Sequence, residues 1–208
     1  MLSPGFHIQM SLLVIEEGRM ELMTSSDLNS YSASLKDVII FEPKLFEDKR
    51  GCFYEVYNDF KYPFINQGIK FVQENISFSK KNTIRGLHFQ KLRPQGKLVT
   101  CLKGEVIDIL VDIRRSSKTY GKFLSISLNE INKKQVWVPP GFAHGFIVKS
   151  DEAVFFYKCT DFYDPSDEYG IAWNDKFLNI PWGINEPIIS EKDSKLPSFK
   201  EAAVNFTS

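Results

Sequence analysis

Residues 97–128 read KLVTCLKGEVIDILVDIRRSSKTYGKFLSISL and contain three apolar runs separated by two polar segments. Lys103-Gly104-Glu105 and Tyr120-Gly121-Lys122 are typical turn sequences, because glycine readily adopts the backbone angles that turns need. The last run, LSISL at 124–128, alternates strictly between apolar residues and serines. A period of two is the pattern of a β-strand with one buried face. The segment therefore predicts three consecutive strands.

Similar short runs, separated by Gly, Pro, Asn and Asp, continue on both sides of this segment. The expected strands are Val38–Glu42, Phe53–Tyr57, Phe71–Phe78, Thr83–Gln90, Lys97–Leu102, Glu105–Ile113, Phe123–Leu128, Lys134–Val138, Gly145–Val148 and Ala153–Cys159. Helical periodicity of 3.6 residues is nearly absent from the middle of the chain. Many short strands of this kind predict an all-β sandwich, jelly roll or barrel.

The two ends of the chain differ from this middle. Residues 1–35 have weak periodicity and a Ser/Asn-rich stretch, so we expect an N-terminal extension with some helix around Leu12–Leu22. Residues 36–208 are expected to form one folded domain. The tail from Trp173 to Ala203 contains three prolines, and it predicts loops with one or two short C-terminal helices.

Composition excludes several classes of protein. The 208 residues carry 26 Lys+Arg and 26 Asp+Glu, so there is no overall field to attract nucleic acid or an anionic membrane. Three cysteines at wide spacings make neither a disulfide framework nor a zinc finger. The apolar run Met10–Ile15 is too short for a membrane span. We expect a reduced, cytoplasmic protein.

The chain has three histidines, and two of them lie in distinctive surroundings. His88 lies in RGLHFQ, residues 85–90, where strict alternation would put Arg85 and His88 on opposite faces of a strand. A bulge at Gly86 would bring both to one face. With Lys97 nine residues further on, His88 is expected in a polar group that lines the barrel. His7 lies in the extension without polar company.

His144 lies in PPGFAHGF, residues 139–146, a tight turn that presents the imidazole at the start of a strand. This segment resembles the second signature of the cupin superfamily, a small jelly-roll barrel. Metal-binding cupins add two histidines and a glutamate from a first motif, whereas here that region supplies only His88. Two distant imidazoles without a carboxylate at ligand spacing are a poor divalent site. A metal-dependent cupin enzyme is therefore the weaker alternative.

A closer resemblance emerges when the motifs are taken in order. The segments are FEPK (41–44), DKRG (48–51), FYE (53–55), QEN (73–75), RGLHFQ (85–90), QGKLV (95–99), GEV (104–106), DIR (112–114), PGFAHGF (140–146), YK (157–158), FY (162–163), EYGI (168–171), WND (173–175) and SEKD (190–193). Together they resemble the dTDP-4-dehydrorhamnose 3,5-epimerase family over residues 36–200. The resemblance implies a homodimeric jelly-roll enzyme without metal or organic cofactor. It implies inversion of carbons 3 and 5 of a dTDP-linked 4-keto-6-deoxy sugar.

Epimerisation next to a ketone needs a base on one face, a stabiliser at the ketone oxygen and an acid on the other face. The resemblance nominates His88 as the base, paired with Asp193, which would fix its tautomer. Lys97 is expected to stabilise the enolate, since a compact ammonium suits a developing oxyanion. Tyr157 is expected to be the acid.

The resemblance also implies a set of substrate-binding residues. Arg50, Arg85 and Lys192 are expected at polar or phosphate groups, and Tyr163 is expected to stack on the thymine. The remaining pocket residues are expected to be Glu55, Gln73, Glu74, Asn75, His144 and Glu168. A single-centre epimerase acting on a related nucleotide-linked keto sugar stays open as an alternative, because the same acid and base serve either reaction. A non-catalytic sugar-nucleotide-binding barrel is a further alternative, although pure binding needs no base opposite an acid.

Overall fold

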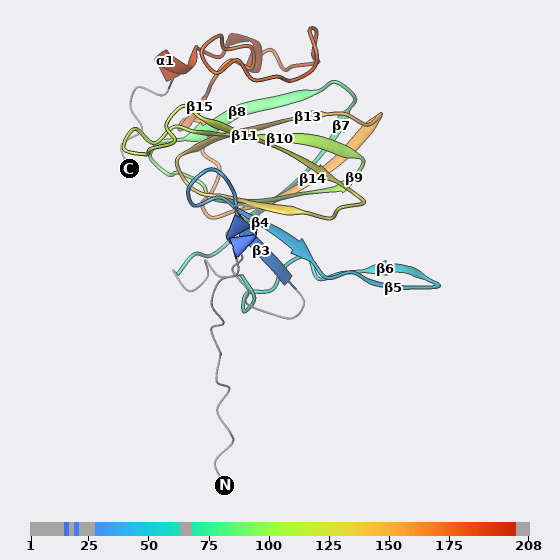
Figure 1. The fold of residues 1–208 in the computed structure, drawn as a ribbon. Coiled ribbons are helices and arrows are strands. Elements are labelled where there is room, and N and C mark those ends of the chain that lie inside the picture. The colour runs from blue at the N-terminus through green and yellow to red at the C-terminus, as the bar shows by residue number, and fades with distance from the viewer. Residues whose placement is uncertain (1–14, 17–18, 21–27, 63–67, 203–208) are drawn as a thin grey trace.

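The computed structural model describes residues 15–16, 19–20, 28–62 and 68–202. Two antiparallel sheets stack face to face (Figure 1). The five-stranded sheet has the order β11 (Phe123–Asn129), β10 (Glu105–Asp112), β13 (Phe142–Val148), β8 (Ile84–Gln90) and β15 (Glu168–Gly170). The six-stranded sheet has the order β3 (Leu28–Ser32), β4 (Ile39–Pro43), β12 (Gln135–Val138), β9 (Lys97–Lys103), β14 (Glu152–Cys159) and β7 (Gln73–Lys80). The predicted all-β jelly roll is confirmed.

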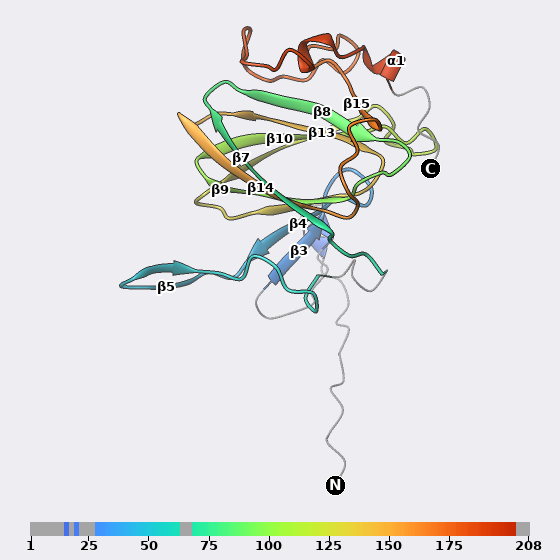
Figure 2. The same ribbon diagram turned by 180° about the vertical axis from the view of Figure 1, so that it is seen from behind.

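The remaining elements lie outside this sandwich. The strands β5 (Phe46–Asp48) and β6 (Gly51–Phe53) form a hairpin that projects away from both sheets (Figures 1 and 2). The C-terminal segment, with the 3-10 helix η2 (Asp193–Lys195) and α1 (Phe199–Ala202), lies over the outer face of the five-stranded sheet. Within the described ranges, no helix is long and apolar enough to cross a membrane.

The continuous apolar runs of the sequence are explained by burial on both faces of the five-stranded sheet. In β10, Leu110 packs into the core between the sheets, whereas Ile109 and Val111 pack against the C-terminal segment. Each of these side chains is at most 1% exposed. A strand buried on both faces reads as an uninterrupted hydrophobic run rather than as an alternation. The alternating LSISL run belongs to β11, which is the edge strand of this sheet.

The expected bulge near Gly86 is present in β8. His88 lies opposite His144, but Arg85 lies opposite Phe146, so three steps along β8 match two steps along β13. The extra residue returns Arg85 and His88 to the same face of the strand. Gly86 has φ +108°, and a Cβ there would lie 2.6 Å from the carbonyl oxygen of His144. Only glycine fits this conformation and this close approach.

The structure corrects several predicted elements. The expected strand Phe53–Tyr57 is wrong, because Phe53 ends the short β6 and residues 54–57 are not a strand. The expected helix around Leu12–Leu22 is wrong where the chain is described, since β1 (Ile15–Glu16) pairs with β2 (Arg19–Met20). The rest of that stretch lies outside the described residues. Within the expected extension, β3 pairs with β4 and adds an edge strand to the six-stranded sheet.

Candidate active site

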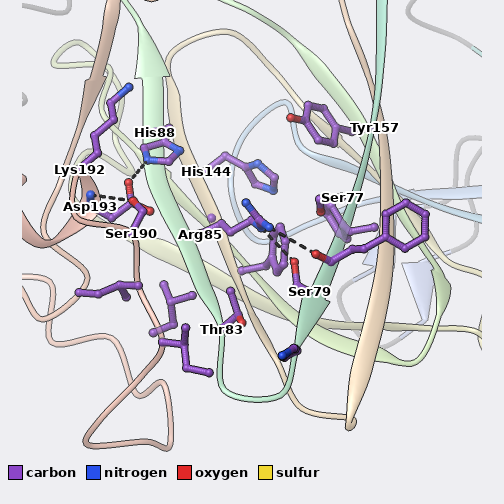
Figure 3. Close-up of a pocket in the computed structure, with 18 of the residues that line it drawn as sticks. Ser77, Ser79, Thr83, Arg85, His88, His144, Tyr157, Ser190, Lys192 and Asp193 are labelled. Atoms are coloured by element: carbon purple, nitrogen blue, oxygen red, sulfur yellow. Dashed lines mark hydrogen bonds and ion pairs between the residues drawn. The ribbon is translucent and has the colours of Figure 1, made fainter.

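A cavity of about 600 Å³ lies between the two sheets (Figure 3). One wall comes from β8 and β13, and the opposite wall comes from β7, β9 and β14. The cavity brings together many of the sequence-predicted site residues: Arg85, His88, Lys97, His144, Tyr157, Tyr163, Glu168, Lys192 and Asp193. A smaller adjoining cavity adds Gln73 and Asn75. The inward faces of two sheets therefore converge on one space.

His88 and Asp193 form a hydrogen-bonded pair at one wall of the cavity. His88 Nε2 lies 2.7 Å from Asp193 Oδ1, and the carboxylate also accepts from the backbone N–H of Gly86 at 3.3 Å. Asp193 donates its own N–H to Ser190 Oγ at 3.0 Å, which fixes the start of η2. Burial alone would raise the pKa of Asp193, but the bonds from His88 and Gly86 hold that pKa below its ordinary value. Asp193 therefore stays ionised beside the imidazole.

Tyr157 lies on the opposite wall. It comes from β14, and Figure 3 shows His88 and Tyr157 on opposite sides of the space, with His144 between them. Phe155, two residues earlier on the same strand face, also lines the cavity, as the period of two requires. Burial raises the pKa of Tyr157, so the phenol keeps its proton well above neutral pH.

Lys97 begins β9, and its side chain also faces the cavity. Removal from bulk water lowers the pKa of Lys97, while the surrounding groups Cys159, Glu168 and Asp108 act in the opposite direction. An ammonium in this position is poorly solvated, so it is available to an anion that forms inside the cavity.

His144 is buried and also pairs with a carboxylate. Its Nε2 lies 2.8 Å from Oδ1 of Asp108, which comes from the neighbouring strand β10. Asp108 is fully buried, and His144 is 8% exposed. Sequence analysis nominated His144 but missed Asp108. The sequence did contain a clue to Asp108. In the run GEVIDILVDI, residues 104–113, a period of two places Asp108 on the same strand face as Val106 and Leu110.

Glu168, Lys192 and Tyr163 form a connected group at the rim of the cavity. The Glu168 carboxylate accepts hydrogen bonds from the Lys192 ammonium and the Tyr163 hydroxyl. Its other oxygen lies 3.8 Å from His88 Nδ1. Burial would raise the pKa of Glu168, but these neighbours lower it overall. The negative charge of Glu168 is therefore maintained next to His88.

The side chains of the QEN segment, residues 73–75, alternate between the two faces of β7. Gln73 and Asn75 face the cavities and are joined by a hydrogen bond of 3.0 Å. Glu74 points to the other face of the sheet, where it pairs with Lys158. Three consecutive residues of a strand cannot all face one side, so Glu74 does not line the cavity. Arg85 does, and its guanidinium is held by Ser79 Oγ at 3.0 Å.

Arg50 and Glu55 do not reach the cavities of their own chain. Arg50 is at the tip of the β5–β6 hairpin, where it forms an ion pair of 2.5 Å with Asp48. Glu55 follows the hairpin and pairs with Lys61 at 3.0 Å. In the sequence, both are charged residues near a turn, and that pattern does not predict how far a side chain lies from a pocket.

The donor set of the cavity can be compared with the needs of a metal ion. No cluster of three or more His, Cys, Asp or Glu with metal-binding geometry occurs in the described part of the chain. His88 and His144 each use one ring nitrogen for an aspartate instead. The same atoms suit proton transfer, because each imidazole is oriented and each has a carboxylate to balance a positive charge.

Comparison with known proteins shows to which family the chain is similar. The family model described as dTDP-4-dehydrorhamnose 3,5-epimerase matches residues 32–201. The chain is 48% identical over 178 residues to the dTDP-4-dehydrorhamnose 3,5-epimerase of Shigella flexneri, a match that covers 84% of this chain and 98% of that protein.

Solved structures with the same fold are also similar in sequence. The crystal structure of the dTDP-4-dehydrorhamnose 3,5-epimerase from Elizabethkingia anophelis has a TM-score of 0.78 at 47% identity, covering 84% of this chain and 98% of that one. An epimerase from Legionella pneumophila in complex with dTDP-4-keto-L-rhamnose has a TM-score of 0.79 at 43% identity, covering 83% and 93%. By sequence and by fold, the chain belongs to the dTDP-4-dehydrorhamnose 3,5-epimerase family.

Proposed function

We propose that this protein inverts carbons 3 and 5 of dTDP-4-keto-6-deoxy-D-glucose and so produces dTDP-4-keto-L-rhamnose for dTDP-rhamnose synthesis. The observation that carries the proposal is the placement of an imidazole–carboxylate pair and a phenol on opposite sides of one cavity (Figure 3). An epimerase must remove a proton from one face of a carbon and return one to the other face. Two proton-transfer groups across a cavity meet that need.

His88 acts as the base in this proposal. Asp193 holds Nε2, so Nδ1 is the ring nitrogen that takes the proton from the carbon next to the ketone. The imidazolium that forms lies between two carboxylates, Asp193 at 2.7 Å and Glu168 at 3.8 Å. Their charges stabilise the protonated ring as the carbon–hydrogen bond breaks.

Lys97 stabilises the enolate, and Tyr157 completes the inversion. The electron pair of the broken bond moves onto the ketone oxygen, where the Lys97 ammonium offsets the new negative charge. Tyr157 then donates its proton to the opposite face of the same carbon. The high pKa that burial gives Tyr157 keeps the donor loaded near neutral pH. Carbons 3 and 5 both flank the ketone, so one set of groups serves both centres.

The nucleotide is held at the rim. Arg85 and Lys192 bring positive charge to the cavity mouth, which suits the diphosphate. Tyr163 is 49% exposed, so its ring face is accessible for stacking on the thymine. Gln73, Asn75 and His144 supply further polar contacts to the rest of the substrate.

We infer that the working unit is a cytoplasmic homodimer. The β5–β6 hairpin extends from the sandwich with Phe46 46% exposed and Phe53 70% exposed. Exposed aromatic side chains on a projecting hairpin favour a contact with a second copy. Such a contact would also give Arg50 and Glu55 a place near a substrate, which their own chain does not offer.

The proposal is tested by incubating the purified protein with dTDP-4-keto-6-deoxy-D-glucose and identifying the product by proton NMR. A product with the L-rhamno configuration is expected, at the same rate before and after treatment with a chelator. Inversion at only one carbon would replace the proposal with the single-centre alternative. A rate abolished by chelation and restored by a divalent ion would replace it with the metal-dependent one.

A further inference from the structure

His144, which lines the cavity, belongs to a second histidine–aspartate pair that the proposed acid and base do not use. His144 Nε2 lies 2.8 Å from Asp108 Oδ1, a spacing close to the 2.7 Å of His88 and Asp193. His144 and His88 are direct cross-strand partners in β13 and β8. The two pairs are therefore adjacent, with one imidazole of each pair facing the same cavity.

Asp108 is an unusual residue for its position. It lies in the middle of β10, it is 0% exposed, and its inward-facing neighbours Val106 and Leu110 belong to the apolar core. Its second oxygen, Oδ2, has no hydrogen-bond partner among the described residues. A buried carboxylate with an unsatisfied oxygen is costly to folding, so packing alone does not account for an aspartate here.

We propose that Asp108 is a positioning residue for the reaction: its carboxylate keeps the proton of His144 on Nε2 and thereby turns Nδ1 toward the sugar. The inference rests on the proposed function. Nδ1 of His144 has no hydrogen-bond partner among the described residues. It can accept a hydrogen bond from a sugar hydroxyl only while Asp108 holds the proton on the other nitrogen.

The packing of the ring supports this assignment. The His144 ring lies against Phe155, with centroids 6.2 Å apart and planes 26° apart, so contacts on its face restrict its rotation. The orientation of Nδ1 is therefore set by two contacts, the Phe155 ring on one face and Asp108 at the far edge. A hydroxyl held there would fix the sugar ring between His88 and Tyr157. Displacement of a substrate by about 1 Å costs on the order of a hundredfold in rate.

Asp108 also acts on Lys97. Its charge opposes the effect of burial on the Lys97 pKa, together with Cys159 and Glu168. The same carboxylate therefore supports two groups that face the substrate, although it does not line the cavity itself.

The test compares Asp108→Asn with His144→Ala and with the double variant. Asparagine has nearly the same shape but can donate its amide N–H to Nε2, which moves the ring proton to Nδ1. Asp108→Asn is expected to lower kcat by about 10–100-fold, with KM changed less than about threefold. The double variant should be only slightly slower than His144→Ala alone, since Asp108 makes the smallest of the three charge contributions that act on Lys97. Multiplicative losses would overturn the proposal, because Asp108 would then act independently of His144.

A second measurement separates positioning from folding. The ¹⁵N NMR shifts of the His144 ring show which nitrogen carries the proton. Wild-type protein is expected to carry it on Nε2, and Asp108→Asn is expected to move it to Nδ1. Asp112→Asn is the matched control: Asp112 is on the same strand and fully buried, but it binds Arg114, Ser117 and Thr119 in a turn. It should lower the Tm and leave the His144 shifts and kcat unchanged.

The ring shifts do not depend on turnover. If wild-type protein fails to epimerise its substrate, the proposed function fails while the Asp108–His144 pair is still tested by NMR. If wild-type protein is active but His144 carries its proton on Nδ1, the proposed role of Asp108 is wrong and the function stands. Both of these outcomes are measured on wild-type protein, so neither depends on whether a variant folds.

Discussion

At the scale of single residues, the chemistry depends on a base whose partner is fixed. His88 is held by Asp193 at 2.7 Å, and its Nδ1 is the atom proposed to remove the proton. His88→Ala is expected to lower kcat by about 10²–10⁴-fold, the usual contribution of a positioned base, with a modest change in KM. Steady-state kinetics on a variant with unchanged Tm would measure it. An unchanged kcat would remove His88 from the mechanism.

Tyr157 is expected to matter for a different step. In Tyr157→Phe the base is intact, so protons on carbons 3 and 5 should still exchange with solvent while net inversion is strongly reduced. Exchange and product formation can be followed together by NMR in deuterated water. Equal losses in both would contradict the assignment of Tyr157 as the opposite-face acid.

The pH dependence of kcat/KM at alkaline pH follows from the opposite effects of burial on the pKa values of Lys97 and Tyr157. Burial lowers the pKa of Lys97 and raises that of Tyr157, and both shifts favour Lys97 as the group that loses its proton first as the pH rises. The alkaline decline of kcat/KM should therefore reflect the loss of the Lys97 charge. In Tyr157→Phe, the rate at which substrate protons exchange with solvent should decline at the same alkaline pH. In Lys97→Arg the residual activity should decline only at higher pH, because guanidinium keeps its proton. A decline that disappears in Tyr157→Phe would contradict this order.

At the scale of elements, the bulge in β8 determines which residues share the cavity wall. Gly86→Ala places a Cβ 2.6 Å from the His144 carbonyl oxygen at a φ of +108°. We expect a loss of about 1–3 kcal/mol in the free energy of unfolding, together with a lower kcat because His88 and His144 are displaced. Gly68→Ala is the control, since Gly68 also has a positive φ but no atom within 4 Å of the added carbon. Chemical denaturation and kinetics of both variants test this; equal, small effects would contradict it.

The elements also show how far sequence reasoning reaches. Strands such as β9, β10 and β14 were predictable because their apolar runs and turn glycines are local signals. The short β15 was not predicted, because three residues carry too little pattern and its pairing with β8 is set by contacts distant in sequence. The family resemblance nominated His88, Lys97, Tyr157 and Asp193 for catalytic roles, and all four line one cavity. Glu74 was nominated for substrate binding, but the alternation of β7 turns its side chain away from the cavities, toward Lys158.

At the scale of the whole molecule, the boundary of the N-terminal extension can be tested by truncation. Deletion of residues 1–27 is expected to leave kcat unchanged. Deletion of residues 1–35 also removes β3 and two buried leucines. Leu28 is 4% exposed and Leu35 is 2% exposed. Each buried leucine contributes about 1.5–3 kcal/mol, so the longer deletion should lower the Tm clearly. Equal stability of the two truncated proteins would show that β3 is dispensable to the sandwich.

In the proposed function, the residues of one cavity remove protons from two carbons of a nucleotide-linked keto sugar and return protons to the opposite faces. The most direct measurement is incubation with dTDP-4-keto-6-deoxy-D-glucose in deuterated water, with deuterium at each sugar carbon read by NMR. The expected result is deuterium at carbons 3 and 5 in a product inverted at both. Deuterium at one carbon only, or at neither while the substrate binds, would contradict epimerisation at both carbons.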